Sequence, residues 1–214
     1  SGIVESLRGG YVNGTTVEAH ENSITEVVQW GNTGLKDLSN AFAGYSMLKS
    51  IPEDNSYAFA EVTDCSYAFH NCGSLTDVPE GLFKNCRKSR SFKDCFSNCS
   101  ELVSLPEGLF ENCKAAESFS FCFFECRKLE ILPDGLFSDL TEAMNFDSCF
   151  QKCKSISSLP ENLFRNCIKA DRFASCFSGC ESLSALPASL FEDCEYATDF
   201  NRCFSGCSSL TDVV

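Results

Sequence analysis

The sequence LVSLPEGLFENC, at residues 102–113, decides the fold because near-copies of it recur along the chain at a fixed spacing. Its proline is one of six, and each proline lies 27 residues after the one before it (79 − 52 = 27). The six are Pro52, Pro79, Pro106, Pro133, Pro160 and Pro187. A fixed period of this length predicts a tandem array, in which each unit buries its apolar face against its neighbours.

Counting each proline as column 1 places units at residues 25, 52, 79, 106, 133, 160 and 187, the first of them without the proline. Columns 5, 14 and 18 contain all but three of the 20 phenylalanines. Column 18 is phenylalanine in every unit: Phe42, Phe69, Phe96, Phe123, Phe150, Phe177 and Phe204. Column 24 is always leucine or isoleucine. We therefore expect these columns to form ladders of buried side chains between the coils.

Within a unit, columns 14, 17, 18 and 21 are apolar, as at Phe92, Cys95, Phe96 and Cys99. This spacing of i, i+3, i+4 and i+7 predicts one face of a short helical turn. Columns 24–27 predict a brief strand that the proline ends, and the Leu-Phe-x-x-Cys after the proline predicts a second helical turn. The expected fold is an α/β repeat solenoid of about seven 27-residue coils, each a short strand plus short helical turns.

The two ends of the chain differ from the repeats. Residues 1–24 break the period, and Asn13-Gly14 between β-forming residues predicts a hairpin that caps the first coil of the solenoid at 25–214. Val214 stands where the next proline is due, and no polar cap follows it. We expect an open apolar coil edge at this end.

Composition and charge exclude several classes of protein. A hydrophobic share of 43% with 22% charged residues excludes a disordered chain, and no apolar run approaches the roughly 18 to 20 residues of a membrane span. The net charge of −13 repels phosphate backbones and anionic lipid. Nucleic acid is therefore not an expected partner, and direct membrane insertion is not expected either.

All sixteen cysteines fall in repeat columns, mostly 17 and 21. Column 21 also admits Tyr45, and column 8 admits Phe59 and Leu140, as expected if the thiol is a small apolar filler. The recurring C-x-x-x-C spacing is compatible with structural zinc, but the two histidines, His20 and His70, do not repeat with it, which disfavours a zinc site. Disulfides between stacked coils are the stronger alternative, since coils roughly 5 Å apart permit the Cα separation. We favour reduced, buried, unreactive thiols.

Acidic residues recur directly after the prolines, in column 2: Glu53, Glu80, Glu107, Asp134 and Glu161. At the start of a helical turn, free backbone N–H groups would offset their mutual repulsion. A ladder that binds cations is the alternative, although divalent sites usually also need carbonyls or a second acid around the ion. We expect no metal site and no cofactor.

No Ser/His/Asp set, phosphate loop or HExxH motif occurs, so an enzyme is not expected from these residues. An exposed repeat surface remains for function, and the fourth unit departs most from the pattern. Val103 and Ile131 interrupt the small polar residues of columns 25 and 26, and Arg127 and Lys128 add positive charge. Phe121 and Phe124 are expected on the outer side of the helical turn, as contacts for a partner or as half-buried packing residues.

The motifs L-x-x-L-P-E-G-L-F-x-N-C and C-F-S-G-C-x-S-L, the latter at residues 176–183, resemble the BspA-like leucine-rich repeats of bacterial surface proteins. The lead-in ITEVVQWG at 24–31 is similar to the start of such arrays, and the resemblance covers about 25–214. It implies a right-handed leucine-rich-repeat solenoid in an exported, extracellular or cell-surface adhesin that binds a protein or glycan of a host or neighbouring cell. The alternative is an intracellular or structural interaction scaffold.

Overall fold

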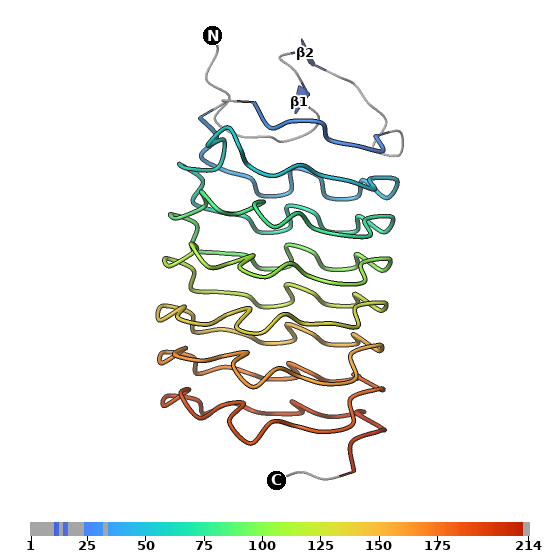
Figure 1. Ribbon diagram of the computed structural model, residues 1–214, viewed down its shortest axis with the longest axis vertical. Helices are drawn as coiled ribbons and strands as arrows, with labels where there is room; N and C mark the ends of the chain where they lie inside the picture. Colours follow the sequence, from blue (N-terminus) through green and yellow to red (C-terminus); the bar gives the residue numbers. More distant parts are fainter. Residues whose placement is uncertain (1–10, 13–14, 17–23, 32–33, 212–214) are drawn as a thin grey trace.

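The computed structural model describes residues 11–12, 15–16, 24–31 and 34–211. In Figure 1 the coils pile on one another along the longest axis, from blue near residue 24 to red near residue 211. Strands β1 (Tyr11–Val12) and β2 (Thr15–Thr16) pair antiparallel, with Val12 opposite Thr15. This pairing is the one that a hairpin around residues 13 and 14 requires, although those two lie outside the described residues. That the hairpin caps the first coil stays a prediction.

Neighbouring coils are in register along a single column of the repeat. Isolated parallel bridges at column 13 join each coil to the next, from Asp37 to Asp199. The residues so joined are Asp37, Asp64, Ser91, Ser118, Asn145, Arg172 and Asp199. Each bridge links two residues that are one repeat apart in the sequence, so each repeat forms one coil of the solenoid.

Columns 13–21 form a wall of hydrogen bonds that run in two directions. The backbone N–H groups of columns 14, 16, 18 and 20 donate to the next coil, as Phe92 does to Ser118 (2.9 Å) and Phe96 to Cys122 (2.8 Å). The N–H groups of columns 17, 19 and 21 instead donate three residues back within the same coil, as from Cys99 to Phe96 (3.1 Å). Every junction between described coils repeats the pattern.

This wall is not the helical turn that the apolar spacing predicts, and the described residues contain no helix. Columns 16 and 20 have positive φ in every unit, for example Asp94 (53°) and Asn98 (62°). A left-handed residue at every fourth position turns the chain out of a right-handed helix. The result is a series of tight turns that leaves alternate N–H groups free for the neighbouring coil. Columns 4–8 are likewise turns.

The strand predicted before each proline is also wrong among the described residues. Between full repeats, only Ser104 and Ile131 form a bridge in these columns among the described residues, next to the hydrogen bond from the N–H of Glu130 to the carbonyl of Val103 (2.9 Å). The bond from the N–H of Val103 to Thr76 (3.2 Å) is its counterpart at the preceding junction. The proline that follows has no N–H to extend a ladder. Contact between coils is therefore brief on this side, and the right-handed course of the coils stays a prediction.

The predicted core columns are confirmed. Column 18 stacks ring on ring, with centroids 5.6 Å apart between Phe96 and Phe123 and 5.5 Å apart between Phe123 and Phe150. Columns 5 and 14 form two more ladders, and their rings meet edge to face, as between Phe110 and Phe119 (4.9 Å). Offset and edge-to-face contacts add to the free energy of burying each ring. These ladders hold the solenoid together.

Candidate partner-binding surfaces

The cysteines are the largest group of chemically reactive side chains, and all sixteen are free and buried. In column 21 the cysteines fill space and also donate hydrogen bonds. The S–H of each column-21 cysteine donates to the column-18 carbonyl of the preceding coil, as Cys126 does to Phe96 (3.1 Å) and Cys153 to Phe123 (3.0 Å). A hydrophobe of similar size has no such donor, which explains why cysteine rather than alanine or valine fills this column.

Burial favours the protonated form of the cysteines whose pKa is raised. It raises the pKa of Cys72, Cys194 and Cys203 to about 12, and it raises that of Cys95 and Cys149 well above the ordinary value. A thiol with so high a pKa is a poor nucleophile and a poor metal ligand at neutral pH. The cysteine ladder therefore stabilises the fold and offers no reactive site.

The column-2 acids line a shallow groove of about 320 Å³ that includes Glu53, Glu80 and Glu107. Lys84 enters this groove, with its Nζ 3.2 Å from Glu53. Farther along, the side-chain amide of Asn162 donates to Asp134 (3.0 Å). Within the described ranges no three His, Cys, Asp or Glu side chains are grouped as metal ligands.

Val103 and Ile131 are exposed, at 40% and 63%, in adjacent coils. The bridge at Ile131 and the hydrogen bond from Glu130 to the carbonyl of Val103 fix the two coils relative to each other. The Nζ of Lys128 lies 2.6 Å from Glu101 of the preceding coil. Val103 and Ile131 are therefore exposed apolar residues on adjacent coils, and an ion pair between Lys128 and Glu101 lies in the segments that precede them.

Phe121 and Phe124 are half-buried, and their rings meet edge to face at 5.7 Å. The Nζ of Lys152 lies over the ring of Phe124 (5.2 Å) and 2.6 Å from Glu125, which also pairs with Arg127 (2.6 Å). These two hydrogen bonds, that from Lys152 first, lower the pKa of Glu125. The pair is thus covered in part by its neighbours, and the charge of Arg127 is balanced locally.

The structure does not join the two parts of the predicted site. Among the described residues, no hydrogen bond, ion pair or ring contact links the Phe121–Phe124 pair to Val103 or Ile131. They are separate surfaces: Phe121, Phe124 and Ile131 lie in the fourth unit, and Val103 lies in the third.

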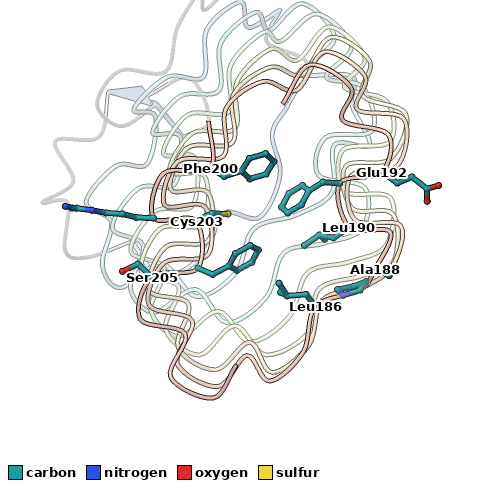
Figure 2. A pocket seen from close by; sticks show the side chains of 11 residues that line it. Leu186, Ala188, Leu190, Glu192, Phe200, Cys203 and Ser205 are labelled. Atoms are coloured by element: carbon teal, nitrogen blue, oxygen red, sulfur yellow. The ribbon is translucent and has the colours of Figure 1, made fainter. Parts of the chain in front are cut away.

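The last described coil has an open apolar end, as predicted. Figure 2 shows Phe200, Cys203 and Leu190 around a depression of about 690 Å³, with Glu192 directed away from it. The N–H groups of Phe200, Arg202, Phe204 and Gly206 find no backbone acceptor within the described part of the chain. In every preceding coil the same columns donate to the next one.

A third surface was not predicted from the sequence. Met144, Ile168 and Tyr196 border a groove of about 550 Å³ on columns 9–12 of the last units, together with Asp171. A signal for it is present in the sequence: columns 10 and 12 are mostly charged in the earlier units, but column 12 becomes Met144 and column 10 becomes Tyr196. The signal is visible only when the same column is compared between units.

No protein-family model and no curated protein matches this chain. Among solved structures, it is similar to the Toll chain of the Drosophila Toll–Spatzle complex, at 20% identity and a TM-score of 0.37 over 74% of this chain and 21% of that one. It is similar to the T. pallidum leucine-rich-repeat protein at 18% identity and a TM-score of 0.28, covering 99% of this chain and 79% of that one. A leucine-rich cell surface protein from Faecalibacterium prausnitzii gives 16% identity and a TM-score of 0.34, with 87% and 69% covered.

The chain thus spans about a fifth of the length of the Toll chain. With TM-scores below 0.5, these likenesses do not assign a family, and the solenoid stands on the repeats and contacts of the chain itself. No helix in the described ranges has the length and hydropathy needed to cross a membrane.

Proposed function

We propose that this chain is a non-catalytic binding module that presents the surface of its repeats to a protein or glycan partner. The observation that supports it most is the exposed pair Val103 and Ile131, which lies in columns where the other units have mainly small polar residues. Apolar side chains held in fixed positions on a rigid scaffold are typical of contact surfaces. Phe121, Phe124, Arg127 and Lys128, which lie in the same unit as Ile131, are proposed as further contacts.

We further propose that the module belongs to an exported, BspA-like leucine-rich-repeat protein of a bacterial surface, which adheres to a host or neighbouring cell. This rests on the LPEGLF and CFSGC motifs. A second candidate is an intracellular or structural scaffold. The sixteen free thiols favour it, because unpaired cysteines persist most readily in reducing compartments.

The binding proposal is tested with the intact array against immobilised extracellular-matrix proteins and glycans. The double variant Val103→Ser/Ile131→Ser should lose binding by about tenfold or more, as expected for truncating contact hot spots. Val28→Ser/Met47→Ser is the matched control, because both side chains are exposed (76% and 44%) but lie in the first unit. Equal loss in both variants, or in neither, would refute the assignment of the partner surface to Val103 and Ile131.

The Phe121→Ser/Phe124→Ser variant separates recognition from packing. Lost partner binding with an unchanged urea midpoint assigns the pair to the partner surface. A lowered midpoint with unchanged binding assigns it to packing. Fractionation of the native cells, with an antibody against the array, distinguishes display on the surface from an intracellular scaffold.

A further inference from the structure

The groove on columns 9–12 combines apolar walls with an unpaired carboxylate. Three of the nine exposed large hydrophobic side chains in the described part of the chain border it: Met144 (41%), Ile168 (40%) and Tyr196 (64%). Lys169, Asp171 and Thr198 complete the lining. These columns lie apart from columns 25 and 26, which carry Val103 and Ile131.

Ion pairs between neighbouring coils are the rule for the carboxylates of columns 10 and 12. The carboxylate of Glu61 pairs with Lys88 (2.6 Å), that of Glu117 with Arg90 (3.1 Å) and that of Glu142 with Lys169 (2.8 Å). Each pair crosses from one coil to the next and leaves neither charge isolated. On this face, acids are therefore matched by bases one repeat away.

Asp171 is the exception. Its neighbours one repeat before and after in column 12 are Met144 and Thr198, neither of which is charged. The two bases nearest to it in its own unit have other partners: Lys169 is held by both oxygens of Glu142 (2.8 Å each), and Arg172 pairs with Asp147. The Oδ1 atom of Asp171 is covered and accepts no hydrogen bond from the described residues. A covered oxygen without a donor is unfavourable. Asp171 as a whole is partly exposed and lines the groove, so a ligand in the groove can pair with the carboxylate although Oδ1 is covered.

The character of the missing donor follows from these surroundings. A net charge of −13 repels anions and attracts cations, so the carboxylate and the whole molecule favour the same sign of ligand. Apolar walls on either side match a long aliphatic stem that ends in a charge. A cation beside Tyr196 can also lie against its ring. Arginine and lysine side chains have this form, and arginine offers several donors in a fixed fork.

We propose that this groove binds a polypeptide partner through an arginine or lysine flanked by apolar residues. The charged group pairs with Asp171, while the aliphatic stem and the flanking residues cover Met144, Ile168 and Tyr196. The site therefore recognises a basic, apolar peptide segment, which is a narrower class of partner than a general repeat surface would select.

The test uses a fluorescent peptide, acetyl-GLRLG-amide, and a counterpart with glutamine in place of arginine, both titrated into the intact array. Asp171→Asn should weaken binding of the arginine peptide by about tenfold or more, as expected for loss of a charge-assisted hydrogen bond. Tyr196→Ser should weaken it as well. Glu130→Gln removes the same charge from an exposed acid elsewhere and should leave binding unchanged.

Several outcomes would overturn the proposal. One is that the two peptides bind equally, which would make the groove purely apolar. Another is that Asp171→Asn and Glu130→Gln weaken binding alike, which would reduce the effect to net charge. A third is self-association that Tyr196→Ser abolishes, which would assign the groove to a second copy of the chain. Thermal unfolding of each variant shows whether a loss of binding reflects a loss of fold; Asp171→Asn should not destabilise it.

Discussion

Raising the pH above 9 should unfold the solenoid, because its thiols are buried in the neutral form. Burial raises the pKa of Cys203 to about 12 and that of Cys176 well above the ordinary value of 9.0. A folded pKa above the unfolded one gives stability that is fully present below pH 9. That stability is lost as the pH rises toward the folded pKa, because only the unfolded chain releases its protons.

The size of the effect follows from the number of thiols in each coil. At pH 10, one pH unit above the ordinary thiol pKa, each buried thiol whose pKa is well raised favours the unfolded chain by about 1.4 kcal/mol. The unit that starts at residue 160 contains Cys167, Cys176 and Cys180, all with raised pKa. That unit alone would lose about 4 kcal/mol, against a total stability of about 5–15 kcal/mol for an ordinary domain. We expect cooperative unfolding between pH 9 and about 10.5.

The assay is urea unfolding followed by far-UV circular dichroism from pH 7 to 10.5, with a reductant present. The chain itself suggests the control, because column 17 is alanine at Ala41 and Ala68. In the control the five column-17 cysteines are replaced by alanine: Cys95, Cys122, Cys149, Cys176 and Cys203. It should lose about 7 kcal/mol less than the parent between pH 8 and 10. Parallel curves for the two proteins, or an intact parent at pH 10.5, would refute the reasoning.

Three further substitutions test the packing. Phe123→Ala should lower the free energy of unfolding by about 3–5 kcal/mol, because its ring is fully buried. Phe204→Ala, at the partly open last coil, should lower it by about 1–2 kcal/mol. Equal losses in urea unfolding would contradict the claim that stacking between coils buries the ring. Gly179→Ala should cost about 1–2 kcal/mol because φ is +77° there, while Gly73→Ala, whose added Cβ lies 3.8 Å from its nearest neighbour, should cost nothing measurable. Asp54→Ala should lower the free energy of unfolding by at least about 3 kcal/mol, because two buried backbone N–H groups and a side-chain amide lose their acceptor. Asp54→Asn keeps one acceptor oxygen and should lose less of this free energy, as measured by calorimetry.

The buried ladders were predictable from the sequence because equal spacing leaves them one arrangement. A phenylalanine every 27 residues can be buried repeatedly only if it meets its own copy in the next coil. Column 18 therefore stacks as predicted, with Phe123 midway along the ladder. The exposure of Val103 and Ile131 also followed from their columns.

The local conformation was predicted wrongly because two structures share one pattern. Apolar residues at i, i+3, i+4 and i+7 suit a helix, but they also suit turns that repeat every four residues. A signal did distinguish them: column 20 contains Gly44, Asn71, Asn98, Gly179 and Gly206. Glycine and asparagine favour the left-handed region, so their recurrence at one column indicated turns. Glu125 and Lys152 in the same column conceal this signal.

Only the tertiary structure decided how the backbone satisfies its hydrogen bonds. The N–H of Phe96 donates to Cys122 in the next coil, and this bond exists only once the coils have stacked. Local sequence preferences do not specify such a long-range partner. The equivalent bond from the N–H of Phe121 to Asp147 (2.9 Å) accompanies a φ of 57° at Phe121, a value that phenylalanine does not favour. The same holds for charge: which acids find a base one repeat away, and that Asp171 does not, depends on the stacking of side chains. The sequence by itself determined the period and the buried columns, because repeated apolar side chains must meet their own copies.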